Sequence, residues 1–286
     1  MKLEFTKMEG LGNDYIYVDA SRFQIADPAE LSRRLSDRHF GIGGDGLVLI
    51  GPSETADFSM RMFNADGSEG MMCGNAARCI GKYVYDKGLT RELNIGLQTP
   101  SGVVRLNLHP GSDGLVDSVT VGMGAFRIVE KGRIVEAGGK SFTGTVVDVG
   151  NPHFVVFCEG AGTVDPSDDG PGIEKSFPGG INVEFASVVE PGLIRMRVWE
   201  RGSGVTLACG TGACATVAAA VETGIPGIPG FPVVPGSPVI LSEAKDLSHS
   251  SCTVVMDGGE LQVTCIGGSI SMRGSARTVF DGVVEV

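Results

Sequence analysis

Short runs of alternating apolar and polar residues, bounded by glycine, predict that most of this chain forms β-strands. A helical spacing of apolar residues predicts three helices. The first begins with Asp27 as N-cap and Pro28 as first helical residue, and runs to about Ser36. The predicted strands cover residues 3–8, 15–19, 47–50, 58–63, 92–97, 103–108 and 116–121, then 144–149, 154–157, 192–199, 252–256, 260–265, 269–272 and 277–280.

Each of the other two helices follows a Cys-Gly pair. After Cys73-Gly74 the apolar residues lie on one helical face, which predicts a half-buried helix. After Cys209-Gly210 the residues are small and apolar on all sides, which predicts a helix surrounded by protein. Both helices end at glycines: Gly88 is expected in the C′ position of the first, and Gly224 ends the second.

The two Cys-Gly pairs belong to an internal repeat. Shifting the sequence by 136 positions, the separation of Cys73 and Cys209, aligns the copies without a gap. Gly43-Gly44 then falls on Gly179-Gly180, Met60-Arg61 on Met196-Arg197, Phe63 on Trp199, Ala77 on Ala213 and Gly88 on Gly224. We therefore expect two related halves.

These patterns predict an α+β fold of two pseudo-symmetric domains. Each domain would be a mixed, mostly antiparallel sheet wrapped around one central helix, with the active site in the interdomain cleft. Residues 1–113 with 274–286 would form the half that carries Cys73, and residues 114–273 the half that carries Cys209. A proline-rich stretch near 225–250, with proline at every third position, predicts an exposed loop of polyproline II type or a partner-docking segment.

Composition narrows the function classes. A net charge of −11 argues against a sequence-independent nucleic-acid binder. No signal peptide and no apolar run long enough to cross a membrane is visible. The seven cysteines are an odd number without a CxxC pair or zinc-ligand spacing, which favours reduced thiols in a cytoplasm and argues against a metal.

Cys73 and Cys209 are the candidate acid/base groups. A helix amino end lowers the pKa of a thiol from about 8.5, because unpaired N–H groups favour the anion. The same N–H groups bind carboxylates, and a following glycine lets a ligand approach the backbone. Inversion of a carbon centre needs a base on one face and an acid on the other, and two facing thiols supply both. The other five cysteines are expected in the core.

Further polar residues occupy comparable places in the two halves. Asn64 and Glu200 each stand nine positions before their cysteine, and Asn13 and Asn151 each follow a glycine in a predicted turn. His153 closes a Gly-Asn-Pro-His turn and is a candidate functional histidine, whereas the other three histidines are expected to be structural. Arg201 has the fork geometry that pairs with a carboxylate.

At these residues the sequence resembles the diaminopimelate epimerases, cofactor-independent enzymes of bacterial and plant lysine synthesis. The matching motifs are GLGNDY (10–15), GIGGDG (41–46), FNADGSEGMMCGNAARC (63–79), GNPH (150–153), GGINVEF (179–185) and WERGSGVTLACGTGACA (199–215). Proline and hydroxyproline racemases share the architecture, but their first motif is typically MCGH where this chain has MCGN. The resemblance departs at Gly46, where some members have glutamine, and at the longer proline-rich stretch.

The resemblance implies epimerisation of LL-2,6-diaminopimelate to meso-diaminopimelate by a thiolate/thiol pair, in lysine and cell-wall precursor synthesis, without cofactor or metal and as a homodimer. It implies that His153 tunes Cys73 and that Glu200 tunes Cys209. The implied substrate contacts are Asn13, Asn64, Gly74, Asn75, Asn151, Asn182, Glu200, Arg201, Gly210 and Thr211. A proline or hydroxyproline racemase and a non-catalytic thiol-sensor or metal-binding protein stay as alternatives.

Overall fold

The computed structural model describes residues 2–225, 228 and 250–286. These residues form two compact units, Met1–Gly122 with Arg273–Val286 (unit 1) and Met123–Met272 (unit 2). We keep the boundaries predicted from the sequence, after residues 113 and 273, as a proposal. The proline-rich stretch near 225–250 lies almost wholly outside the described residues.

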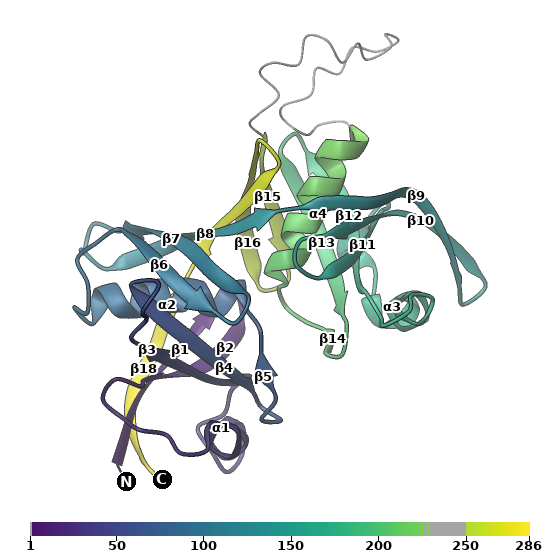
Figure 1. Cartoon of the computed structure of the whole chain (residues 1–286). Helices are drawn as coiled ribbons and strands as arrows, with labels where there is room; N and C mark the ends of the chain where they lie inside the picture. The colour runs from purple at the N-terminus through teal and green to yellow at the C-terminus, as the bar shows by residue number, and fades with distance from the viewer. Residues whose placement is uncertain (1, 226–227, 229–249) are drawn as a thin grey trace. The chain divides into compact units, whose positions relative to one another are not determined.

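Unit 1 is a mixed sheet around one helix, α2 (Figure 1). Its strands pair in the order β18-β1-β2-β3-β4-β6-β7-β8, with β5 as a hairpin partner of β4. The β2–β3 and β4–β6 pairs are parallel and the others antiparallel. The elements are β1 Lys2–Gly10, β2 Asn13–Asp19, α1 Pro28–Ser36, β3 Gly46–Gly51, β4 Phe58–Asn64, β5 Glu69–Gly70, α2 Gly74–Asp86, β6 Asn94–Thr99, β7 Gly102–Pro110, β8 Val116–Ala125 and β18 Arg277–Glu285.

Unit 2 repeats the first seven strands of this order. Its order is β9-β10-β11-β12-β13-β15-β16, with β14 as the hairpin partner of β13, and the β11–β12 and β13–β15 pairs are again parallel. The elements are β9 Arg127–Ala137, β10 Lys140–Asp148, β11 Pro152–Phe157, the short 3-10 helix η1 Ala161–Thr163, α3 Pro166–Lys175, β12 Asn182–Glu190, β13 Leu193–Glu200, β14 Gly204–Val205, α4 Gly210–Thr223, β15 Ser250–Met256, β16 Gly259–Ile266 and β17 Ser269–Ser275, which ends in unit 1. The predicted repeat and the predicted α+β fold class are therefore confirmed.

The two central helices are buried by the sheets that curl around them. Helix α2 contacts β1 and β2 as well as β7, and α4 contacts β9 to β12 as well as β15 and β16. Ten of the fourteen residues of α4 are buried, because alanine, glycine and valine let the strands approach on every side. The predicted starts of both helices are also confirmed, because Cys73 and Cys209 are the N-caps. The predicted end of α4 is confirmed as well, because Gly224 has a left-handed φ of 68° there.

Asp27 caps α1 as predicted, because its side chain accepts a hydrogen bond from the Glu30 N–H. Five elements of unit 2 were not predicted: strands β9, β12 and β14, helix α3 and the 3-10 helix η1. The predicted strands stop at residue 157 and resume at residue 192, so they pass over β12, which holds Glu184.

Candidate functional site

Cys73 stands where an extended residue turns into helix α2. Its φ of −131° and ψ of 119° are extended, and its carbonyl accepts the N–H of Ala77 at 2.9 Å. The thiol donates to Asn13 Oδ1 at 3.5 Å, and Asn13 Nδ2 donates to Asp45 Oδ2 at 2.7 Å. The structure thus brings two predicted site residues, Cys73 and Asn13, together within unit 1.

An ionic network holds Asn13 in place. Lys7, which is buried, lies 2.7 Å from the Asp14 carboxylate and also donates to the Gly43 carbonyl. Arg38 bridges Asp14 at 2.8 Å and Asp45 at 3.0 Å. Burial acts to raise the pKa of Asp14, but the bonds from Arg38 and Lys7 outweigh it and leave that pKa below its usual value. The glycine-rich loop 41–46 therefore anchors Asp45 behind Asn13, a role that the sequence interpretation missed.

The other predicted residues of unit 1 lie at the ends of secondary-structure elements. Gly74 and Asn75 are the first two residues of α2, and both are buried. Asn64 ends β4, and its side-chain amide donates to the Ser68 hydroxyl at 2.9 Å. Gly46 pairs with Asn64 across β3 and β4.

Cys209 is the buried N-cap of α4, with 5% of its surface exposed. Its sulfur accepts the Gly212 N–H at 3.4 Å and lies 3.4 Å from the Thr211 hydroxyl. Burial raises the pKa of the Cys209 thiol well above its usual value, and the charges of Glu200 and Glu184 raise it further. The hydrogen bonds at the helix start act to lower this pKa, as expected, but burial and the two carboxylates outweigh them.

A chain of hydrogen bonds runs from a buried carboxylate to Cys209. Glu184 Oε1 lies 2.7 Å from His153 Nδ1, and neither side chain is exposed. His153 Nε2 lies 3.0 Å from Asn151 Oδ1, and Asn151 Nδ2 donates to the Thr211 hydroxyl at 3.4 Å. Thr211 in turn contacts the Cys209 sulfur. Four predicted site residues of unit 2 therefore form one network, and Glu184 completes it.

Glu200 also contacts Cys209. Its side chain is partly buried, which raises the pKa of its carboxyl, while bonds from the Thr206 hydroxyl and the Cys209 thiol act to lower that pKa. The backbone N–H of Arg201, the next residue, donates to Asn182 Oδ1 at 3.0 Å, and Asn182 Nδ2 donates to the Pro152 carbonyl at 2.9 Å. The pairing of His153 with Cys73 stays a prediction.

Glu184 was missed although it lies inside the predicted GGINVEF motif. A Cβ at Gly212 would stand 2.7 Å from Glu184 Oε1 and 3.3 Å from the Cys209 sulfur, so the carboxylate lies against the start of α4. The signal available in the sequence was an acidic residue between apolar neighbours, Val183 and Phe185, in a strand where burial is otherwise expected.

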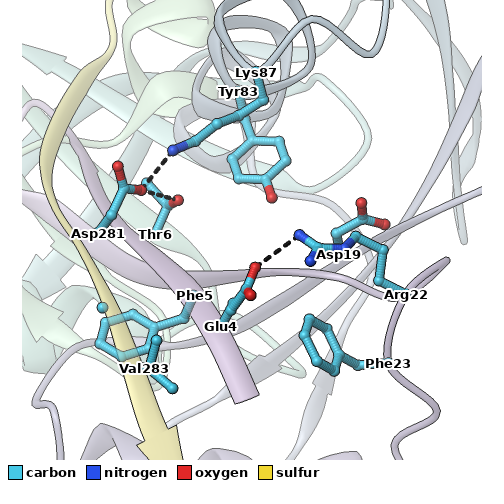
Figure 2. A pocket seen from close by; sticks show the side chains of 11 residues that line it. Glu4, Phe5, Thr6, Asp19, Arg22, Phe23, Tyr83, Lys87, Asp281 and Val283 are labelled. Carbon is cyan, nitrogen blue, oxygen red and sulfur yellow. Dashed lines mark hydrogen bonds and ion pairs between the residues drawn. The ribbon is translucent and has the colours of Figure 1, made fainter. Parts of the chain in front are cut away.

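A pocket of about 380 Å³ in unit 1 lies away from these residues (Figure 2). Four of its charged groups form two ion pairs, Glu4 with Arg22 at 2.8 Å and Asp281 with Lys87 at 2.6 Å. It contains none of the predicted site residues. Among the described residues, no three His, Cys, Asp or Glu side chains are grouped to hold a metal, and no helix there is long and apolar enough to cross a membrane.

Solved structures share this fold. A PhzF-family phenazine biosynthesis protein of Bacillus anthracis matches with a TM-score of 0.73 at 14% identity over 100% of both chains. A hydroxyproline epimerase of Agrobacterium vitis matches with a TM-score of 0.66 at 16% identity, over 99% of this chain and 91% of that one. These matches define the class of this protein by its fold, the two-unit α+β fold, in which this chain carries two cysteine-capped helices.

Sequence comparison identifies the family within that class. The family model for diaminopimelate epimerase matches residues 5–129 and 145–279. Proteins named diaminopimelate epimerase are 48% identical in Bacteroides thetaiotaomicron and 46% in Parabacteroides distasonis, each over 99% of this chain and 98% of the relative, and 41% identical in Leptospira biflexa over 100% of both. The chain belongs to the diaminopimelate epimerase family, which confirms the resemblance expected from its motifs.

Proposed function

We propose that this protein epimerises LL-2,6-diaminopimelate to meso-diaminopimelate, in lysine and cell-wall precursor synthesis, with Cys73 and Cys209 as the acid/base pair. The observation that carries the proposal is the duplicated unit, in which each copy places a cysteine as the N-cap of a buried helix. Membership of the family and relatives at 41–48% identity support the substrate.

In the proposed reaction one cysteine thiolate removes the proton from the α-carbon, and the C–H electron pair stays on the substrate as a carbanion delocalised into the carboxylate. The other cysteine, as a thiol, donates its proton to the opposite face and becomes the thiolate. The enzyme is left with the proton on the first cysteine, so the two residues exchange roles when the direction is reversed. No cofactor is required, and the substrate undergoes no net oxidation or reduction.

The helix amino ends are the proposed holders of the reacting carboxylate. The backbone N–H groups of Gly74 and Asn75 start α2, and those of Gly210 and Thr211 start α4. Asn13, Asn64, Asn151, Asn182 and Arg201 are proposed to bind the distal amino-acid end, where amide groups and a guanidinium fit an ammonium and a carboxylate. Glu200 and His153 are proposed to set the protonation of the thiols.

A substrate panel tests this function. Purified protein incubated with LL-diaminopimelate should form the meso isomer, seen by chiral chromatography, and should leave L-proline and trans-4-hydroxy-L-proline unchanged. Racemisation of proline or hydroxyproline without turnover of diaminopimelate would establish the racemase alternative. This alternative is tested because a hydroxyproline epimerase has the same fold. Inactivity on all three, with stoichiometric zinc in the protein, would favour the metal-binding alternative.

A cytoplasmic homodimer is also proposed. Strand β18 pairs with β1 and exposes three apolar side chains, Val279, Phe280 and Val283, between 46% and 60%. Exposed apolar side chains on one strand favour contact with a second protein surface. Light scattering after size exclusion should give twice the mass of one chain, and a Val283→Asp variant should shift it toward the monomer; a monomeric wild type at working concentration rules the dimer out.

A further inference from the structure

Glu184 is a buried carboxylate whose hydrogen-bond partner is His153. It lies on β12 between Val183 and Phe185, and its side chain is fully buried. Its Oε1 lies 2.7 Å from His153 Nδ1, whereas Oε2 has no hydrogen-bond partner among the described residues. Replacing both members of a buried ion pair by apolar side chains of similar volume is often neutral for stability, so stability alone does not explain this carboxylate.

Unit 1 forms the matching strand pair without such a carboxylate. In the parallel pairs β2–β3 and β11–β12, Tyr15 takes the place of His153 by strand register, and Val48 takes the place of Glu184 by the offset of 136 positions. The fold therefore does not require a carboxylate–imidazole pair at this place, and the pair belongs to what distinguishes unit 2 from unit 1.

In unit 1 a carboxylate sets the orientation of an asparagine amide. Asn13 Nδ2 donates to Asp45 Oδ2 at 2.7 Å, and Asn13 Oδ1 accepts from the Cys73 thiol at 3.5 Å. Asp45 is paired with Arg38 at 3.0 Å, and a carboxylate only accepts hydrogen bonds, so it holds the amino group of Asn13. Asn13 therefore turns its carbonyl oxygen, an acceptor, toward the start of α2.

In unit 2 the corresponding asparagine has the opposite orientation. Asn151 Oδ1 lies 3.0 Å from His153 Nε2, and Asn151 Nδ2 donates to the Thr211 hydroxyl at 3.4 Å. Thr211 is the second residue of α4, so Asn151 turns its amino group, a donor, toward the start of that helix. Thr211 uses one of the two N–H bonds of this amino group, and the other has no partner among the described residues.

The pair of Glu184 and His153 accounts for this orientation. Since an amide oxygen only accepts hydrogen bonds, His153 Nε2 must carry a proton. Both side chains are fully buried, and an uncompensated buried charge is costly, so the pair is neutral as a whole. It is then either imidazolium with carboxylate, or imidazole with a carboxyl group that donates to Nδ1, and Nε2 is protonated in both. Without Glu184, a neutral imidazole could place its one proton on either nitrogen, and the Asn151 amide could rotate to match.

We propose that Glu184 is a positioning residue that, through His153, fixes the Asn151 amide with its amino group toward the start of α4. Asn151 then donates a hydrogen bond to a carboxylate oxygen of the substrate, whereas the Asn13 carbonyl only accepts. The inference deepens the proposed function and rests on it, because it states which group of the substrate Asn151 recognises. Glu184 itself does not touch the substrate.

The protonation of the His153 ring in the free enzyme is the first test. Protein labelled with ¹⁵N-histidine is analysed by NMR near neutral pH, because a bare imidazole nitrogen resonates far downfield of a protonated one. The His153 signals are those, among the signals of the four histidines, that are missing from the double variant His153→Phe/Glu184→Leu. Nε2 is recognised because it couples to both carbon-bound ring protons. We expect Nε2 to be protonated, and a bare Nε2 overturns the proposal whatever the activity.

Steady-state kinetics with LL-diaminopimelate give the second test. Glu184→Leu should raise KM by about tenfold or more and keep kcat within about threefold, because a hydrogen bond to a charged group of the substrate is lost. In an Asn151→Ala background the same substitution should change KM no further, since Glu184 acts through Asn151. Asn151→Asp keeps an acceptor for His153 but replaces the donor by a second acceptor, so it should raise KM at least as much as Asn151→Ala. Asp169→Leu removes another mostly buried carboxylate of unit 2, which is paired with Lys140 at 2.9 Å, and is the matched control that should leave KM unchanged.

The outcomes separate the possibilities. A KM of Asn151→Asp close to that of the wild type overturns the donor orientation. An equal rise in KM from Glu184→Leu in the wild-type and Asn151→Ala backgrounds leaves Glu184 a structural residue. If Glu184→Leu does not fold, the NMR result and Asn151→Asp decide. Because the NMR measurement is made on the free enzyme, failure of the proposed function on diaminopimelate is recognised separately.

Discussion

Removing Glu184 should destabilise unit 2 strongly, because it leaves the buried Nδ1 atom of His153 without its partner. The two side chains are 2.7 Å apart and neither is exposed. At that distance the two groups make a hydrogen bond, and a hydrogen bond to a charged group contributes about 1.5–3 kcal/mol. Desolvation cancels part of it, and Glu184 Oε2 has no hydrogen-bond partner among the described residues, so part of that cost is never recovered. We expect Glu184→Leu, which roughly keeps the volume, to lose about 3 kcal/mol of unfolding free energy.

Urea unfolding followed by tryptophan fluorescence measures this loss in the correct unit. Trp199 is the one tryptophan of the chain, packs against the hydrophobic core of unit 2, and donates to Glu174 at 2.7 Å. The double variant His153→Phe/Glu184→Leu removes both partners and should recover to within about 1 kcal/mol of the wild type. Glu130→Leu is the control, because its ion pair with Arg133 is exposed, and should change stability by less than about 0.5 kcal/mol.

The reasoning would be refuted by either of two results. One is a Glu184→Leu variant within about 1 kcal/mol of the wild type, which would mean that the pair contributes little. The other is a double variant whose loss is the sum of the two single losses, since strict additivity excludes coupling between contacting residues.

Two further predictions concern unit 1. Asp14 has a lowered pKa in the folded state, so its contribution to stability is present above the unfolded pKa of about 3.9 and is lost as the pH falls through the folded value. Asp14→Asn should therefore cost about 1 kcal/mol of unfolding free energy at pH 7 and almost nothing at pH 2, measured by urea unfolding at both pH values. An equal cost at both pH values would contradict this prediction. Gly46→Ala should cost about 3 kcal/mol, because its Cβ would lie 2.0 Å from the Phe63 carbonyl oxygen, which the sheet holds in place. Gly122→Ala, whose nearest contact is 3.6 Å, should stay within about 0.5 kcal/mol in the same assay, and equal losses in the two variants would show that packing is not the cause.

Features with a local cause were predictable from the sequence. The starts of α2 and α4 follow from Cys-Gly before a helical pattern, and the ends from glycines at C′. The topology of each unit was predictable because the internal repeat contains the same order of strands and helix twice. Asp165 and Pro166 carry the same start signal as Asp27 and Pro28, so the amino end of α3 was also detectable.

The features that the sequence did not predict depend on packing between residues far apart in the chain. Helix α3 contains Pro171 and two glycines, which lower its helix propensity, and it is stabilised by contacts with β9, β12 and β13. Strand β9 is mostly exposed and has no clear alternation, but it pairs with β10 along most of its length. The raised pKa of Cys209 arises from burial and from carboxylates on β12 and β13, and neither the burial nor the distance of these carboxylates from the thiol can be read from spacing along the chain.

Deuterium incorporation tests the central claim most directly. LL-diaminopimelate is incubated with the protein in D₂O, and the product is analysed by NMR and mass spectrometry. The two-thiol account predicts one solvent deuterium at the inverted α-carbon of the meso product, and a fall in rate of about 10²–10⁴-fold in both Cys73→Ala and Cys209→Ala. Meso product without deuterium at that carbon, or full activity in either cysteine variant, would contradict it.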